Sequence, residues 1–241
     1  MSIASEISRL QNDSSAIASA IRAKGVTVPS GAGYDDYASL IGQISSGGGG
    51  GRLPSGYTEL DYVQTDSVAY VDTGVAGATD LEITAVYSWH SYVQYGYIYG
   101  NYVSESAKSN RVLLMSQSAI YVAGGNSLAT QVNNSVIGAI HTLVVRSNEA
   151  YLNGIRTAIS AGSQSANSTN IALGKGYVTS TTVRDLELRI YSFAISKNGS
   201  QVLNYVPCLD SNSVAGFYDL INDVFKPSAS ATAFVAGPIR Q

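Results

Sequence analysis

Residues 45–51 read SSGGGGG, and this run limits the fold more than any other feature of the chain. Glycine loses more backbone entropy on folding than any other residue, so five in succession favour a flexible linker over a helix or strand. The sequence therefore predicts two parts that are built separately. We expect a short α-helical part at residues 1–45, a glycine-rich linker at residues 46–52 and a larger domain at residues 53–241.

The first 24 residues carry a helical pattern of hydrophobic residues, which ends before Gly25. Large aliphatic side chains and one serine recur at alternating intervals of four and three residues, at Ile3, Ile7, Leu10, Ser14, Ile17 and Ile21. This spacing is typical of a heptad seam, and isoleucine at both seam positions favours three or more strands over two.

A second short helix is expected after Asp35 or Asp36, either of which can cap its N-terminus. Its hydrophobic face consists of Tyr37, Leu40, Ile41 and Ile44. Two interpretations of this part stay open. In one, the helices pack on each other or on the larger domain. In the other, the first helix is a stem that forms a homotrimer, because an isolated helix of this length is marginal in water. The oligomerisation residues would then be Ile3, Ile7, Leu10, Ile17 and Ile21.

From Arg52 onward, short alternating runs replace the helical spacing. Residues 81–89 alternate between a polar set and a hydrophobic set, which predicts a strand with one core-facing side. The hydrophobic set is Leu81, Ile83, Ala85, Tyr87 and Trp89. Within residues 183–191, the charged side chains of Asp185, Glu187 and Arg189 alternate with the hydrophobic ones of Leu186, Leu188 and Ile190. Further strands are expected at residues 97–103, 111–115, 119–122, 141–146, 150–153, 155–159, 201–206, 216–219 and 233–235, with a tight turn at Asn153–Gly154.

About ten to fourteen short strands without intervening helices predict a mainly β domain, an antiparallel two-sheet sandwich of jelly-roll type. The net charge of −3 and the absence of a basic block exclude a nucleic-acid-binding surface. Apolar runs are far shorter than the ~20 residues of a membrane span, and MSIASEISRL lacks the regions of a secretory signal. We therefore expect a protein made in a cytoplasm, with no membrane partner.

Three segments of the larger domain resemble one family. They are LPSGYTELDYVQTDSVAYVDTGV at residues 53–75, HTLVVRSNEAYLNGIRTAI at 141–159, and LRIYSFAISKNGSQVLNYVPCLDSNSVAGFYDLINDVFKPSASATAFVAG at 188–237. They resemble the laminin-G-like, concanavalin-like sandwiches of bacteriophage tail and other virion proteins. The segment AIRAKGVTVPSGAGYDDYASLIGQI, residues 20–44, resembles a helix–extended–helix element of phage tail-fibre proteins.

The resemblance implies a two-sheet jelly roll mounted on an oligomeric phage appendage, localised in the virion and attached to other phage structural proteins through the N-terminal stem. Many relatives of this fold bind calcium. The aspartates of this chain at Asp66, Asp72, Asp80 and Asp210 are scattered, so we assign no metal site and no cofactor.

No catalytic constellation is visible, and we expect no enzyme. Asp185 and Glu187 have the alternate spacing of carboxylates in concanavalin-like glycan hydrolases, but position 189, where a third acid would stand, is arginine. We interpret this strand as a solvated sheet face. His141, at the start of a predicted strand, and Cys208, the only cysteine, are expected to be structural.

Residues 87–102, YSWHSYVQYGYIYGNY, hold six tyrosines, the only tryptophan and a histidine among small polar residues. This composition is typical of binding surfaces, and aromatic rings suit stacking on sugar rings. The candidate ligand-binding residues are Trp89, His90, Tyr92, Tyr95 and Tyr97. In the alternative interpretation, the tyrosines divide between the core and the outer face of a sheet.

The resulting hypothesis is a phage appendage protein whose sandwich binds a host-surface glycan or another surface partner. One alternative is a purely structural tail or capsid fibre or decoration protein without a ligand. A second alternative is a surface-glycan depolymerase. The fold by itself does not decide among them, because one fold hosts many functions.

Overall fold

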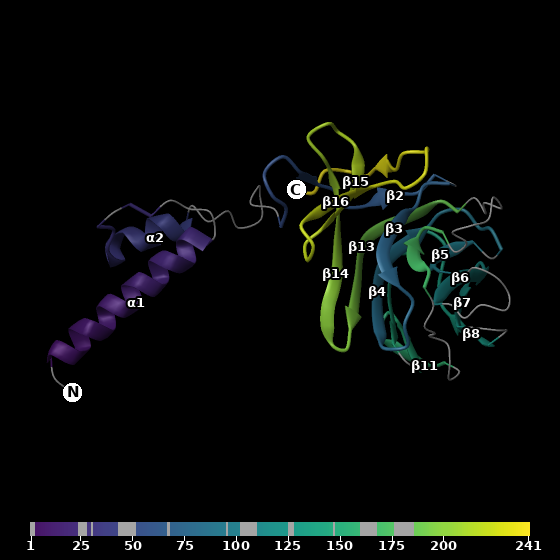
Figure 1. The fold of residues 1–241 in the computed structure, drawn as a ribbon, viewed down its shortest axis with the longest axis horizontal. Coiled ribbons are helices and arrows are strands. Elements are labelled where there is room, and N and C mark those ends of the chain that lie inside the picture. The colour runs from purple at the N-terminus through teal and green to yellow at the C-terminus, as the bar shows by residue number, and fades with distance from the viewer. Residues whose placement is uncertain are drawn as a thin grey trace. The chain divides into compact units, whose positions relative to one another are not determined.

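The structure is a computed structural model that describes residues 3–23, 28–29, 31–42, 52–66, 68–94, 96–101, 110–124, 128–146, 148–159, 168–175 and 186–241. The chain divides into two compact units, Met1–Pro54 and Ser55–Arg240 (Figure 1). The predicted glycine linker, apart from Arg52, lies outside the described residues.

The first unit is a pair of helices, α1 (Ile3–Ala23) and α2 (Tyr34–Gly42). They enclose a small apolar cluster of Ala18, Ile21, Val28, Tyr37 and Leu40, with Ile17 and Ala32 packed against it. Ser14, the polar position of the predicted seam, lies 2.8 Å from the hydroxyl of Tyr37. The packed-helix interpretation is therefore confirmed for the C-terminal half of α1. Neither described helix is long and apolar enough to cross a membrane.

The second unit is mainly β and contains two antiparallel sheets. The larger sheet has the strand order β11 (Ile155–Ala158), β10 (Glu149–Leu152), β9 (His141–Arg146), β4 (Leu81–Trp89), β13 (Leu188–Lys197), β14 (Ser200–Leu209), β15 (Ala215–Asp219) and β16 (Val224–Pro227). Three two-residue strands join it from the side, β1 (Thr58–Glu59), β2 (Val63–Gln64) and β17 (Val235–Ala236). The smaller sheet has the order β3 (Val71–Ala76), β12 (Asn170–Leu173), β5 (Tyr97–Gly100), β6 (Arg111–Ser116), β7 (Ala119–Gly124) and β8 (Leu128–Asn133).

One apolar core takes side chains from both sheets, as a β-sandwich requires. Its largest fully buried members are Trp89, Tyr87, Tyr99, Tyr205, Phe193 and Phe217. The alternation predicted for residues 81–89 is confirmed, because Leu81 and the other odd positions of β4 are all buried. The side chains between these positions therefore project from the opposite face of the larger sheet. This face points away from the core and is called the outer face below.

Two hairpins of the larger sheet close with the same asparagine–glycine turn. Asn153 and Gly154, between β10 and β11, have φ values of 52° and 80°, which confirms the predicted turn. Asn198 and Gly199, between β13 and β14, have φ values of 50° and 77°. Positive φ at both central residues is the type I′ geometry, which matches the twist of two paired strands.

The strand predicted at residues 183–191 is placed differently. It begins at Leu188 and runs to Lys197, and residues 183–185 lie outside the described residues. A β-bulge between Ile190 and Ser192 changes the alternation, so that Phe193 and Ile195 are buried after Ile190. One inserted residue shifts every later side chain to the other face, and a simple period of two cannot anticipate this.

The described residues contain seventeen strands, more than the expected ten to fourteen. The excess comes partly from β1, β2 and β17, which have two residues each and are too short to show an alternation. The strand expected at residues 97–103 ends at Gly100, and residues 102 and 103 lie outside the described part.

Candidate ligand-binding surface

The predicted aromatic candidates do not share one exposed face. Trp89 is fully buried, because it stands on the core-facing side of β4, and the structure thereby corrects its assignment as a ligand-binding residue. Tyr92 packs against the core, with its ring centroid 6.3 Å from that of Trp89. His90 and Tyr97 are partly buried, and Tyr95 lies outside the described residues.

Trp89 supports a neighbouring loop. Its indole N–H donates to the hydroxyl of Ser135 at 3.2 Å, and its carbonyl accepts the N–H of Gly138 at 2.8 Å. The loop held in this way exposes three aliphatic side chains, Val136, Ile137 and Ile140. The tryptophan therefore contributes by anchoring residues 135–138 and not by contacting a ligand.

A different set of side chains meets on the outer face of the larger sheet. Arg189 of β13 pairs in register with Gln64 of β2 on one side and with Ser88 of β4 on the other. Residues paired in this way project to the same face of an antiparallel sheet. The three strands lie side by side in Figure 1. The sequence separates Gln64 from Arg189 by 125 residues, and only the fold brings them together.

Arg189 is held in a fixed position. Its Nε donates to Oε1 of Gln64 at 2.8 Å, and its guanidinium carbon lies 4.8 Å from the ring centroid of Tyr62. Stacking on an aromatic face and a hydrogen bond at Nε orient the planar end of the side chain. In the described part of the chain, neither terminal guanidinium nitrogen of Arg189 has a hydrogen-bond partner.

Tyr62 is itself fixed by its neighbours. The ring of Tyr191 meets it edge-on at 5.4 Å, and the chain at Gly237 passes directly over it. A Cβ atom at position 237 would lie 2.8 Å from Cδ2 of Tyr62, a distance that real side chains do not adopt. Gly237 is therefore the residue that allows the C-terminal segment to pack on this ring.

His90 and Glu187 extend the surface by one more pair. The N–H of His90 donates to the carbonyl of Glu187 at 2.9 Å, which continues the β4–β13 ladder beyond Trp89. Nε2 of His90 lies 2.9 Å from the hydroxyl of Ser88, which in turn lies 3.3 Å from that of Tyr191. Burial lowers the pKa of His90, and the positive charge of Arg189 lowers it further, whereas Glu187 raises it.

The seven residues Tyr62, Gln64, Ser88, His90, Glu187, Arg189 and Tyr191 are called the Arg189 surface here. Apart from buried Ser88, they are all partly buried, so their polar atoms are accessible while their positions are restrained. Such a set can donate and accept hydrogen bonds and offers aromatic edges, which suits a polar ligand. Of these residues, the sequence pointed to a ligand only for His90.

Of the other polar residues considered in the sequence, one belongs to the Arg189 surface, and the others are buried or lie outside the described part. Glu187 belongs to the Arg189 surface, but Asp185 is outside the described residues, so the structure does not test the spacing of the two carboxylates. His141 is buried, with Nε2 2.9 Å from the carbonyl of Val136 and Nδ1 3.1 Å from the amide of Asn153. Cys208 is buried too, and burial raises the pKa of its thiol to about 12. No group of three or more metal-ligating side chains occurs among the described residues.

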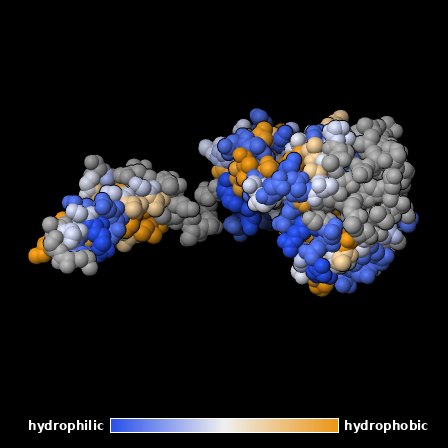
Figure 2. Space-filling view, turned by 60° about the horizontal axis from the view of Figure 1, so that its bottom comes forward, coloured by the Kyte–Doolittle hydropathy of each residue, from blue (hydrophilic) through white to orange (hydrophobic). Residues whose placement is uncertain are grey.

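The predicted oligomerisation seam of α1 is divided into two parts. Ile21 is buried against α2 and Ile17 packs on the same cluster, so both are used within the chain. Ile3, Ile7 and Leu10 are exposed by 82%, 52% and 46%, and these values leave a stripe of apolar surface for a partner. Figure 2 shows hydrophobic patches on the surface of the helical unit among its hydrophilic residues.

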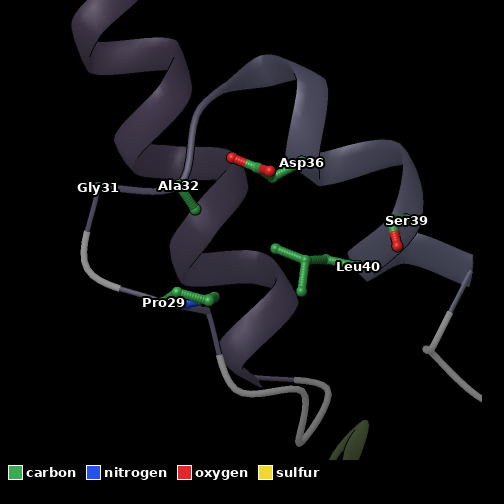
Figure 3. A pocket seen from close by; sticks show the side chains of 6 residues that line it. All are labelled: Pro29, Gly31, Ala32, Asp36, Ser39 and Leu40. Atoms are coloured by element: carbon green, nitrogen blue, oxygen red, sulfur yellow. The ribbon is translucent and has the colours of Figure 1, made fainter.

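Among the described residues, two hollows lie beside the helices. The larger, of about 400 Å³, lies along the exposed stripe and is lined by Ile7, Leu10, Gln11, Ser14, Ser15 and Tyr34. The smaller, of about 280 Å³, is lined by Pro29, Gly31, Ala32, Asp36, Ser39 and Leu40 (Figure 3). In the smaller one, the carboxylate of Asp36 accepts the N–H of Gly33 at 2.9 Å and so caps α2. Only the larger hollow extends the apolar stripe.

In comparisons with known proteins, no protein-family model matches the chain, and no curated protein matches it in sequence.

Proposed function

We propose that this chain is a non-enzymatic appendage protein of a bacteriophage virion, made in the cytoplasm of the bacterial host. Its second unit is a laminin-G-like jelly roll that binds a glycan on the host surface. Its helices assemble copies of the chain and attach them to other structural proteins of the particle. The segments at residues 53–75, 141–159 and 188–237 support this family, as do the two antiparallel sheets.

The observation that carries the binding function is the Arg189 surface. A plain solvated sheet face holds long charged side chains that contact mainly water. Here Arg189 is stacked on Tyr62 and hydrogen-bonded to Gln64. His90, Glu187 and Tyr191 belong to the same surface. Restraint of this kind lowers the entropy lost on binding, and is typical of ligand contacts.

The stripe of Ile3, Ile7 and Leu10 supports the assembly function. Exposed apolar side chains at heptad spacing need a partner, and isoleucine at both kinds of seam position favours a trimer. α2 covers the later part of the same side of α1 within each chain. The trimer contact is thus confined to the first three positions and the hollow beside Tyr34.

One observation favours the structural alternative, a fibre or decoration protein without a ligand. Val136, Ile137 and Ile140 are exposed on a loop that Trp89 holds in place. Clusters of exposed aliphatic side chains mark contacts between proteins, so this loop suits a neighbouring subunit of a particle.

Retention of the full-length chain on immobilised bacterial polysaccharides and O-chains tests the proposal. We expect saturable binding to at least one of them, without release of oligosaccharides. Absence of binding across a broad panel, together with a trimeric chain, would favour the structural alternative. Release of shorter sugars that is lost in the Glu187→Gln variant would establish a depolymerase.

A further inference from the structure

We propose that Arg189 and Glu187 together bind adjacent hydroxyl groups of an uncharged sugar, and that the Arg189 surface selects neutral glycans over acidic ones. The inference rests on the proposed glycan-binding function and adds the chemical class of the ligand. It follows from the positions of the donors, the acceptors and the charges on the outer face of the larger sheet.

The donors come from Arg189. Since Nε is occupied by Gln64 and one face of the guanidinium is stacked on Tyr62, its orientation is fixed before a ligand arrives. The terminal nitrogens, which have no partner in the described part of the chain, form a planar fork. A planar fork with fixed orientation donates to two oxygen atoms at once.

The acceptor is Glu187. It stands two residues before Arg189 and faces His90 across the ladder, so its carboxylate is on the same face roughly 6–7 Å along the strand. No hydrogen bond to this carboxylate occurs in the described part of the chain. A sugar hydroxyl both donates and accepts, so two neighbouring hydroxyls can accept from Arg189 and donate to Glu187.

The local charge excludes an acidic ligand. Arg189 and Glu187 carry opposite charges that cancel, and the lowered pKa of His90 keeps its ring neutral at neutral pH. A carboxylate or phosphate on the ligand would be attracted by Arg189 but repelled by Glu187, which stands two residues away on the same face. The chain as a whole carries a charge of −3, which adds no attraction for an anionic polymer.

The remaining members of the surface fit the same ligand. The hydroxyls of Ser88 and Tyr191 and the ring of His90 form a connected polar edge beside Arg189. The rings of Tyr62 and Tyr191 meet edge-on, with their centroids 5.4 Å apart, and the guanidinium of Arg189 lies over the ring of Tyr62.

The test uses full-length protein on an array of bacterial polysaccharides, half of them uncharged and half containing uronic or sialic acids. We expect the retained glycans to be uncharged, and their binding to be unchanged when sodium chloride is raised from low to ~0.5 M, since charge–charge attraction is screened at that concentration. Arg189→Ala, Arg189→Lys and Glu187→Gln should each weaken binding at least tenfold, because lysine keeps the charge but loses the planar fork.

Matched controls are Arg146→Ala and Glu149→Gln. These two residues form an ion pair elsewhere on the larger sheet, at 3.5 Å, and their removal should leave binding unchanged. Melting temperatures of all variants separate loss of binding from loss of folding. Binding only to acidic glycans, or wild-type binding by folded Arg189 and Glu187 variants, would overturn the inference but leave glycan binding in place. Failure of the wild-type chain to bind any glycan would overturn the proposed function as well.

Discussion

The indole N–H of Trp89 and the hydroxyl of Ser135 are hydrogen-bonded at 3.2 Å in the interior of the sandwich, and neither residue has any exposed surface. The hydroxyl of Tyr87 lies 3.4 Å from the same serine oxygen. One small side chain therefore serves two large buried aromatic residues. Since buried polar groups are costly without a partner, Ser135 is more important to stability than its size indicates.

Replacing Ser135 with alanine should lower the free energy of unfolding by about 1–3 kcal/mol, because the indole N–H of Trp89 would be left buried without an acceptor. Urea denaturation followed by tryptophan fluorescence measures this change. Ser200→Ala, at an exposed position on β14, is the matched control and should change stability by less than about 0.5 kcal/mol. Equal effects of the two substitutions would contradict the assigned role of Ser135.

The sequence predicted the orientation of Trp89 better than it predicted its function. Its place in the alternation with Leu81 and Ile83 indicated the core side, and the structure confirms this. The aromatic-rich composition of residues 87–102 suggested a binding surface, but composition alone does not distinguish the two faces of a sheet. The local pattern was the better guide because the period of two is imposed by the backbone.

The Arg189 surface could not be assembled from the sequence. Tyr62 and Gln64 reach Arg189 only through the pairing of β2 with β13, and β2 has two residues, too few for an alternation. The bulge beside Tyr191 is likewise invisible in the pattern. The Asn153–Gly154 turn was predictable because its geometry depends only on the two residues that form it.

Cys208 should resist thiol reagents while the protein is folded. Burial raises the pKa of this thiol to about 12, so almost no reactive thiolate is present at pH 8, and the side chain has no exposed surface. Iodoacetamide labelling followed by mass spectrometry should give no adduct in native protein and one adduct in guanidinium chloride. A Ser200→Cys variant should gain one rapidly labelled thiol; rapid labelling of Cys208 itself would show that the β14–β15 region opens.

His90 should make the stability of the protein depend on pH. Burial and Arg189 lower its pKa in the folded state, so below its ordinary value of about 6.5 the unfolded chain binds more protons. The contribution of neutral His90 to the free energy of unfolding is therefore fully present above about pH 6.5, and it is lost as the pH falls towards the pKa of the folded state. As the pH falls from 7.5 to 5, the free energy of unfolding of the wild type should therefore decrease more than that of the His90→Gln variant. Parallel stability curves for the two proteins would rule this effect out.

Ile7→Asp combined with Leu10→Asp should convert a trimeric chain to a monomer, because both side chains lie on the exposed stripe of α1. Burying two charges in an apolar interface without partners is strongly unfavourable. Light scattering at micromolar concentration measures the change. Asn12→Asp combined with Ala16→Asp, both exposed on α1 outside the heptad seam, is the charge-matched control. A monomeric wild-type chain would contradict the proposed trimer and favour the interpretation in which the helices only pack within one chain.

The two asparagine–glycine hairpins differ in how their asparagine side chains are held. The amide of Asn153 accepts the N–H of Thr142 at 2.9 Å and lies 3.1 Å from Nδ1 of His141, whereas no side-chain hydrogen bond of Asn198 occurs in the described part of the chain. An asparagine before glycine deamidates when the next backbone nitrogen attacks its side-chain carbonyl carbon, forms a succinimide and expels ammonia. The bonds on Asn153 prevent the rotation that this attack needs. Chemical ageing of the protein will therefore begin at Asn198, and stored samples will gain an acidic species at the β13–β14 hairpin first.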